Sequence, residues 1–230
     1  MKCSAIVTGG TGGLGAAVVN RLLDDGWRVV VPWIVEAELE RIERRDGLEL
    51  IRADLFDPAG VAGVVAAATS DDGTPLRGVA NLVGGFSAGG RIHETPIEEF
   101  EQQFRVNLRA TYLTTQASVS PMLKAGGGSI VCVGTRAALQ PFRGAVGYIA
   151  SKAAVISFAH AVAVEYRDEG IRCNAILPSV IDTPANRAAM PKADHERWVK
   201  PERIAGVVAF LLSDDSEPVS GAAIPVYGRA

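Results

Sequence analysis

Short runs of β-branched residues alternate with longer helical stretches along almost the whole chain, and this alternation constrains the fold more than any other feature. The runs predict seven strands, with the sequences CSAIVT, WRVVV, LELIRA, GVANLV, SIVCVG, IRCNAIL and AAIPV. The stretches between them predict helices at residues 13–26, about 36–45, 58–69, 96–124, 147–169 and 201–213. Because strands that alternate with helices form a parallel sheet with right-handed crossovers, we expect an α/β fold: a doubly wound seven-stranded parallel sheet flanked by helices.

The length and charge of the chain limit what it can be. With 230 residues, 48% of them hydrophobic, the chain can bury one sizeable core but is short for two, so we expect a single domain over residues 1–230. The net charge of −3 gives no basic excess, and we see no apolar run of the roughly 20 residues that span a bilayer. We therefore expect neither a nucleic-acid partner nor a membrane.

The cysteines and histidines indicate no metal site. Cys3, Cys132 and Cys173 are odd in number, lie within apolar runs and match no metal-binding spacing, so we expect buried thiols in a reducing compartment. The histidines are far apart and form no i,i+4 pair. The N-terminus lacks the long apolar stretch of a secretory signal. Together these features predict a cytoplasmic protein without a metal.

The segment TGGTGGLG, residues 8–15, follows the first predicted strand and opens the first predicted helix. Two registers fit it: G-x-G-x-x-G at residues 10, 12 and 15, or T-G-x-x-x-G-x-G at residues 8, 9, 13 and 15. In both, glycine lets the backbone approach a pyrophosphate, and the helix N-terminus supplies N–H groups and the positive end of its dipole. A merely structural loop is the alternative, but the position between strand and helix favours a dinucleotide-binding turn.

The end of the second predicted strand should distinguish NAD from NADP, because an acidic residue there binds the adenosine ribose and an arginine accepts a 2′-phosphate. Residues 31–35, VPWIV, carry neither charge, and Glu36 fits a solvated first helical turn. The sequence thus predicts NAD or NADP without choosing between them. Asp54, after the third predicted strand, fits either a contact to the adenine amino group or a turn before Pro58.

Tyr148 and Lys152 are four residues apart, so they share one face of the predicted helix 147–169. A free tyrosine has a pKa near about 10 and is a poor base at neutral pH, but a nearby ammonium lowers that pKa. We expect Tyr148 to exchange a proton with a carbonyl or alcohol oxygen, and Thr135, just beyond the fifth predicted strand, to hold that oxygen. Ligands of open α/β sheets bind outside the carboxyl ends of the strands, which supports this placement.

The combination of motifs resembles the short-chain dehydrogenase/reductase family over nearly the whole chain. The matching segments are Thr8-Gly9…Gly13…Gly15, Asp54, Asn81-Leu82-Val83-Gly84, Asn107, Tyr148…Lys152 and Pro178-Ser179-Val180-Ile181-Asp182-Thr183. Several ordered motifs at matching separations are more specific than any single one. The resemblance implies a dinucleotide-binding catalytic domain of the Rossmann type that transfers a hydride between NAD or NADP and a small carbonyl or alcohol substrate.

The resemblance also implies roles for individual residues. It makes Tyr148 the general acid/base, has Lys152 bind the nicotinamide ribose and lower the tyrosine pKa, and has Asn107 hold a water in a proton relay. Helices 96–124 and 147–169 would join subunits in a homodimer or homotetramer. The glycine register becomes the second one, and the implied cofactor-binding residues are Gly9, Thr11, Gly13, Leu14, Gly15, Asp54, Leu55, Gly84, Gly85, Tyr148, Lys152, Pro178, Ile181 and Thr183.

Three residues depart from the family's usual motifs. Leu82 replaces an asparagine, Ser179 replaces a glycine, and Thr135 lies where the family usually has serine. Threonine keeps the hydroxyl but adds a methyl group and a stiffer χ1, so the role of the hydroxyl is retained and its geometry is open.

A narrower resemblance is to quinonoid dihydropteridine reductases of the same family, carried by GGFSAGG, GTRAALQPFRGAVGY and DTPANRAAMPKADHERW. Those relatives manage without the serine, which would make Thr135 less critical, but the acid at the end of their second strand aligns with Trp33 here. A pterin reductase is therefore one alternative. A non-catalytic nucleotide-binding sensor is another, and the intact set Asn107, Tyr148 and Lys152 argues against it.

The substrate end is expected to be a small lid at about 179–200, where specificity commonly lies on this architecture. Candidate apolar walls for a small-molecule substrate, with ordinary packing as the equal alternative, are Phe86, Phe142, Met190 and Trp198. Two arginines flank the site and either attract a polar or anionic substrate or are solvated surface residues: Arg136 and Arg143.

Overall fold

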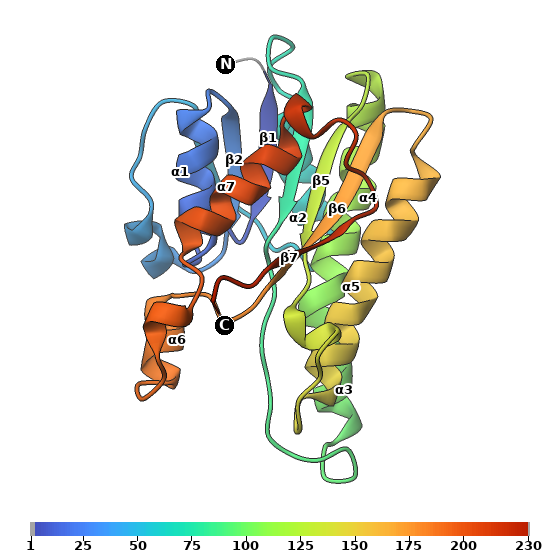
Figure 1. Cartoon of the computed structure of the whole chain (residues 1–230). Coiled ribbons are helices and arrows are strands. Elements are labelled where there is room, and N and C mark those ends of the chain that lie inside the picture. Colours follow the sequence, from blue (N-terminus) through green and yellow to red (C-terminus); the bar gives the residue numbers. More distant parts are fainter. Residues whose placement is uncertain (1–2, 230) are drawn as a thin grey trace.

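The strands form one parallel sheet, as the sequence predicts. A computed structural model of the chain describes residues 3–229 and places the seven strands in the order β3-β2-β1-β4-β5-β6-β7 (Figure 1). All neighbouring strands run parallel, and the chain winds outward from β1 in both directions. The strands are β1 Ser4–Thr8, β2 Arg28–Trp33, β3 Leu48–Arg52, β4 Leu76–Asn81, β5 Gly128–Val133, β6 Ile171–Pro178 and β7 Ala223–Val226.

Helices cover both faces of this sheet (Figure 1). On one face lie α1 (Gly15–Asp24) and α7 (Pro201–Leu212), which pack against each other. On the other lie α2 (Pro58–Ala68), α4 (Ala110–Lys124) and α5 (Val146–Glu165). Both faces are therefore buried, and this explains the continuous apolar runs of the central strands. In β2, for example, Val29 and Val31 face the α1 and α7 side, whereas Val30 faces the opposite side.

Two helix predictions were wrong in detail. The predicted helix at about 36–45 is only a 3₁₀ turn at Glu36–Arg41, and none of its residues is buried. Most of the stability of a short helix comes from an apolar face packed on the core, which this segment lacks. The predicted helix 96–124 consists of α3 (Ile97–Phe104), a π-helical turn at Arg105–Arg109, and α4.

The helix α5 corrects a further expectation. It is long and apolar enough, by length and composition alone, to cross a membrane, whereas no such run was expected from the sequence. A single helix of this kind is weak evidence, because the core helix of a globular protein passes the same test. In the structure α5 packs against β5 and β6 and buries Val155, Ile156 and Ala159 in the core.

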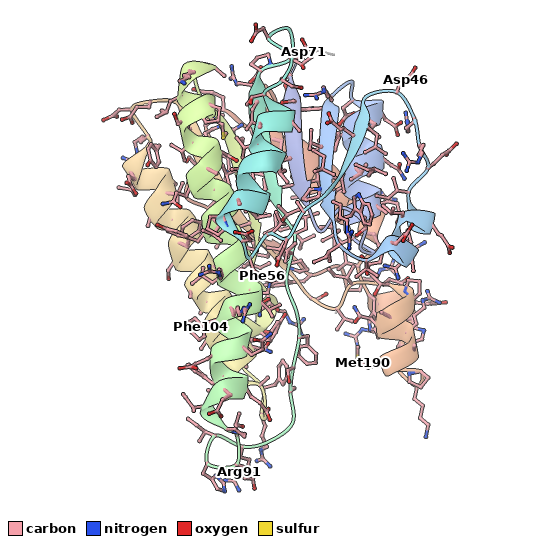
Figure 2. The ribbon with its side chains drawn as sticks, turned by 180° about the vertical axis from the view of Figure 1, so that it is seen from behind. Asp46, Phe56, Asp71, Arg91, Phe104 and Met190 are labelled. Atoms are coloured by element: carbon pink, nitrogen blue, oxygen red, sulfur yellow. The ribbon has the colours of Figure 1, made fainter. Side chains whose placement is uncertain are left out.

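Three loops extend beyond the carboxyl end of the sheet, where the candidate site residues gather. They comprise residues 82–96 after β4, residues 134–145 after β5, and residues 179–200 after β6, which contain α6 (Pro184–Ala189). In Figure 2 the labelled Arg91 and Met190, from the first and third of these loops, both lie beyond this end. Segments far apart in sequence thus meet at the carboxyl end of the sheet, which is where open α/β sheets bind their ligands.

Candidate active site

The glycine-rich turn after β1 is folded so tightly that several of its glycines leave no room for a Cβ atom. Gly9 has φ of +65°, which favours glycine, and a Cβ added at Gly15 would clash with the Gly9 carbonyl oxygen. A Cβ at Gly10 would lie 2.6 Å from Val31 Cγ1, on the sheet side of the turn. Gly13 instead faces Thr183, whose Cγ2 lies 2.9 Å from where its Cβ would be. The second register therefore contains the glycines that close the turn and face the segment after β6.

The turn leaves the N-terminus of α1 open to an anion. No side chain caps the first N–H groups of α1, whereas on α2 the Asp57 carboxylate accepts a hydrogen bond from Ala59 N. Uncapped N–H groups and the positive end of the helix dipole attract negative charge, so this end of α1 fits the pyrophosphate of a dinucleotide.

Thr8 holds the turn against the neighbouring strand β4. Its Oγ1 accepts hydrogen bonds from Leu82 N at 3.0 Å and Val83 N at 3.3 Å. These are backbone contacts, so the departure of Leu82 from the family's asparagine does not affect them. The Leu82 side chain packs against the α1 and α7 side of the core.

A polar cluster that sequence reasoning missed lies beside the turn. Thr11 Oγ1 donates to Glu38 Oε2 at 2.7 Å, and Arg41 Nη1 donates to the Thr11 carbonyl oxygen at 3.3 Å. Arg41 also pairs with Glu38 at 3.2 Å, just beyond the end of β2 at Trp33. Because the cluster brings both a carboxylate and a guanidinium to the turn, its chemistry fits either NAD or NADP.

The residues after β3 have structural roles of their own. Asp54 Oδ1 accepts a hydrogen bond from Phe56 N at 2.8 Å, which confirms the prediction of a turn-forming aspartate. The Leu55 side chain is buried in the core, so only its backbone remains for a cofactor. The adenine contact implied for these two residues stays a prediction.

Lys152 is buried beneath the loop that follows β4. Its side chain is 5% exposed, and its Nζ donates to the Val133 carbonyl oxygen at 2.8 Å. Burial lowers the pKa of Lys152 to about 8, and the nearby Cys132 acts weakly in the opposite direction. A Cβ at Gly84 would lie 2.9 Å from this Nζ and 2.7 Å from Asn107 Oδ1, so a larger residue here would displace one of these side chains.

Tyr148 does not have the lowered pKa that the sequence suggested. Burial raises the pKa of the Tyr148 phenol, and a hydrogen bond with the Thr135 hydroxyl partly offsets this. The prediction assigned the dominant effect on this pKa to the Lys152 ammonium, whereas desolvation of the phenolate and the Thr135 hydrogen bond set it here. The direction of this shift depends on burial, which the spacing of two residues in the sequence does not report.

Thr135 is well placed to hold an oxygen atom. It is 8% exposed and caps the short 3₁₀ turn Arg136–Ala138, where its Oγ1 accepts a hydrogen bond from Ala137 N at 3.2 Å. A hydroxyl has one donor and two acceptor positions, so the hydroxyl proton remains for Tyr148 or a substrate oxygen. The backbone of Thr135 is extended, a conformation that β-branched residues adopt readily.

Asn107 lies in the π-helical turn between α3 and α4 and is buried. Its Oδ1 accepts from Gly85 N at 3.0 Å, and its Nδ2 donates to the Gly85 carbonyl oxygen at 3.1 Å and to Ser151 Oγ at 3.1 Å. Ser151 Oγ in turn donates to the Tyr148 carbonyl oxygen. The side chain of Asn107 therefore fixes the loop after β4 to the helix that carries Tyr148, and its water-holding role stays a prediction.

Sequence reasoning missed Ser151, which joins these two elements. A signal was present: a serine three residues after Tyr148 on a helix can donate back to the carbonyl of the preceding turn.

The segment after β6 crosses over the glycine-rich turn. Pro178 ends β6, and Ile181 pairs with Val199 in an isolated parallel bridge that closes the segment into a loop. Thr183 caps α6 by accepting a hydrogen bond from Asn186 N at 3.2 Å, and its methyl group faces Gly13. Ser179 donates to the Tyr227 carbonyl oxygen at 2.7 Å, which ties the base of the loop to the chain after β7.

The four candidate wall residues have different environments. Phe86 and Phe142 are exposed, and the Phe86 ring stands nearly perpendicular to that of Tyr148, with the centroids 4.9 Å apart. Trp198 is buried, and its ring centroid lies 4.4 Å from that of His195. This favours ordinary packing over substrate contact for Trp198. Met190 lies at the end of α6, partly exposed (Figure 2).

The structure gives no substrate contact for the two flanking arginines and groups no metal ligands among the described residues. Arg136 lies over the ring of Tyr227, 5.5 Å from its centroid, which gives it a packing role, whereas Arg143 is exposed. Cys132 and Cys173 are buried as predicted, whereas Cys3 is only partly buried, which corrects the prediction for that residue. Over residues 3–229, no group of three or more metal-ligating side chains lies together.

Comparisons with known proteins agree with this geometry. A family model described as enoyl-(acyl carrier protein) reductase matches residues 9–228. The chain is 34% identical to 2-(R)-hydroxypropyl-CoM dehydrogenase of Xanthobacter autotrophicus, over 99% of this chain and 98% of that protein. It is 32% identical to 2,5-dichloro-2,5-cyclohexadiene-1,4-diol dehydrogenase LinX of Sphingobium indicum, over 97% and 94%. The chain therefore belongs to the short-chain dehydrogenase/reductase family, whose members are NAD(P)-dependent oxidoreductases.

The fold also matches solved structures. ElxO with NADP bound superposes with a TM-score of 0.90 at 22% identity, over 99% of this chain and 98% of that one. At that identity the likeness shows the shared fold, which is the seven-stranded Rossmann-type sheet described above.

Proposed function

We propose that this enzyme transfers a hydride between NAD(P) and a small carbonyl or alcohol substrate, with Tyr148 as the general acid/base. The proposal rests on one observation: the Tyr148 phenol interacts with the Thr135 hydroxyl one helical turn from the buried Lys152 ammonium, at the carboxyl end of β5. The two relatives are named as dehydrogenases of a hydroxypropyl compound and of a cyclohexadiene diol, which supports a substrate of this class.

In the reductive direction the protein's part is to supply a proton. Tyr148 donates its phenolic proton to the carbonyl oxygen as negative charge develops there, and Thr135 donates a hydrogen bond to the same oxygen. In this proposal the Lys152 ammonium, one helical turn along α5, favours the phenolate that remains, because an opposite charge favours the ionised tyrosine. When bound, the nicotinamide supplies the hydride in this direction and accepts it in the reverse one.

The residues that would hold the cofactor follow the order of the chain. The turn at Gly9, Gly13 and Gly15 and the open end of α1 fit the pyrophosphate, and Lys152 is placed for the nicotinamide ribose. The segment 179–200, with Ile181 and Thr183 at its start, would cover the nicotinamide end as a lid.

The test is the variant Tyr148→Phe, which removes the hydroxyl and keeps the ring. We expect turnover on a panel of carbonyl substrates that includes quinonoid dihydropterin to fall by at least about 100-fold, with NAD(P)H affinity unchanged. Tyr166→Phe, at the end of the same helix α5, is the matched control and should keep full activity.

Two outcomes separate the alternatives. If Tyr148→Phe turns over as fast as the wild type, the acid/base role is wrong. If the wild type binds NADH or NADPH tightly but transfers hydride to no member of the panel, the chain is a nucleotide-binding sensor instead.

We also propose that the enzyme assembles through α4 and α5. These two helices expose three large side chains, Tyr112, Leu123 and Val164, and exposed apolar side chains that gather on one face favour association. Sedimentation velocity of the wild type should show a homodimer or homotetramer, and Val164→Glu should sediment as a smaller species. A wild type that sediments as a monomer, or a variant that sediments as the wild type does, would refute this assembly.

Buried thiols at Cys132 and Cys173 suit a reducing compartment, in keeping with a cytoplasmic enzyme.

A further inference from the structure

A small cavity lies where α3 packs against the first turn of α5 (Figure 1). Its volume is about 20 Å³, and its walls come from the loop after β4, from α3, and from the start of α5 with the residues just before it. A buried water needs at least about 10–15 Å³, so the cavity has room for water but not for an organic ligand. Tyr148 lines it, whereas Thr135 and Lys152 do not, so it is distinct from the place where these groups meet a substrate.

The Gln103 side chain brings a hydrogen-bond acceptor without a donor to this cavity. Gln103 lines the cavity and is 8% exposed, and its Oε1 accepts no hydrogen bond from any described residue. The stem of the side chain packs on the backbone of α5, because a Cβ added at Gly147 would lie only 3.3 Å from Gln103 Cγ. Since a buried amide oxygen without a donor is costly, the cavity favours an occupant that donates a hydrogen bond.

The start of α5 brings donors without acceptors to the same cavity. Its first three residues, 146–148, all line the cavity. Within the described chain, Ile149 N is the first N–H of α5 that has a partner, the Ala145 carbonyl oxygen at 2.9 Å, and no side chain caps the helix. The helix therefore offers N–H groups beside the Gln103 oxygen.

The groups around the cavity favour water over an anion. A helix N-terminus attracts anions, but here the Glu99 carboxylate also lines the cavity and Gln103 presents its oxygen, and both repel negative charge. A water molecule carries no charge and both donates and accepts. A buried water typically makes about three hydrogen bonds, which the groups on these walls can supply.

We propose that one water molecule occupies this cavity, donates a hydrogen bond to Gln103 Oε1 and accepts one from an N–H of the first turn of α5. Gln103 is then a positioning residue: through the water it fixes the turn that carries Tyr148, and so holds the Tyr148 phenol against the Thr135 hydroxyl. The water site stands without the proposed function, whereas its effect on turnover rests on that function.

The water itself is tested in the wild type. A high-resolution crystal structure should show an ordered water within hydrogen-bond distance of Gln103 Oε1 and of an N–H of residues 146–148. A second crystal, soaked in bromide, tests for an anion, because bromide gives an anomalous signal. A bromide peak in the cavity, or a cavity without an ordered water, would overturn the proposal.

The variant Gln103→Met keeps the length of the side chain and removes the acceptor. Backbone amide exchange, measured by NMR without cofactor, should become about three- to tenfold faster at Gly147 and Tyr148, which is the effect of losing one hydrogen bond. Gln102→Met changes the exposed neighbouring glutamine on α3 and is the matched control, with no change in exchange expected. Equal exchange in the wild type and Gln103→Met would refute the link between Gln103 and α5.

The positioning role also predicts a change in pH dependence. The Thr135 hydrogen bond lowers the pKa of Tyr148, so a loosened first turn should move the pH–rate profile of alcohol oxidation to higher pH. The kcat of Gln103→Met should fall by about three- to tenfold, with NAD(P)H affinity unchanged. Faster exchange with an unmoved profile would confine Gln103 to a structural role and overturn the positioning.

Failure of this inference is distinguishable from failure of the proposed function. A wild type that turns over no carbonyl or alcohol removes the oxidoreductase mechanism, and the crystal and exchange measurements still decide the water site. Full turnover with no water in the cavity does the reverse.

Discussion

Replacing Lys152 with methionine should change how the stability of the protein depends on pH. The side chain is 5% exposed, and its ammonium has one hydrogen bond, to the Val133 carbonyl oxygen. Burial lowers its pKa from 10.5 to about 8. Since one pKa unit corresponds to about 1.4 kcal/mol, holding the charge in the folded state costs on the order of 3 kcal/mol at neutral pH.

The sign of the pH dependence follows from proton uptake. Between pH 8 and 10.5 the unfolded lysine binds a proton that the folded one has released, so the free energy of unfolding rises with pH in this window. Methionine has no proton to release, and Lys152→Met therefore lacks this rise. Between about pH 7 and pH 10, the wild-type minus variant difference in unfolding free energy should grow by roughly 2–3 kcal/mol.

Urea denaturation of both proteins at a series of pH values measures this difference directly. Lys124→Met, which removes an exposed lysine at the end of α4, is the control and should show a difference that stays flat. A flat difference for Lys152→Met as well would refute the reasoning, because it would mean that the ammonium is not desolvated in the fold.

Two other predictions concern Thr135 and the glycine-rich turn. Thr135→Ala removes a hydrogen bond that lowers the pKa of Tyr148, so the pH–rate profile for alcohol oxidation should move to higher pH, and Thr135→Ser should restore it; full activity at an unchanged pH would favour the pterin-reductase alternative. Gly13→Ala places a methyl group 2.9 Å from Thr183 Cγ2 and should weaken NAD(P)H binding about tenfold by equilibrium titration. Gly63→Ala, which meets no atom within 4 Å, should leave binding unchanged, and equal affinity in both variants would contradict the role of the turn.

The sequence predicted the parts of the fold that depend on local patterning. All seven strands formed where the apolar β-branched runs predicted them. The run is continuously buried in a central strand such as β1, because helices cover both faces of the sheet there. The stretch at 36–45 has good helix formers, but a helix there depends on a core contact that only the three-dimensional structure reveals as absent. The π turn at Arg105–Arg109 was likewise not predicted from the sequence. It carries Asn107, whose contact with Gly85 joins two segments that are distant in sequence.

In the candidate site, too, local spacing could be predicted from the sequence, whereas burial and tertiary contacts could not. Motif spacing predicted that Thr135 and Tyr148 meet, and their hydroxyls do interact, because one lies at a strand end and the other on the adjoining helix. Lys152 follows one turn later on the same helix and bonds to the Val133 carbonyl oxygen. The raised pKa of Tyr148 could not be predicted from the sequence, because it depends on how much of the phenol is buried. The bridge through Ser151 was missed because its partners lie on two separate elements.

The central claim is that the site works with a nicotinamide dinucleotide, and equilibrium binding tests it most directly. NADH and NADPH are titrated separately into the protein and followed by nicotinamide fluorescence. The account predicts saturable binding of at least one of them, unchanged in Tyr148→Phe and weakened in Gly13→Ala. No saturable binding of either cofactor would contradict it.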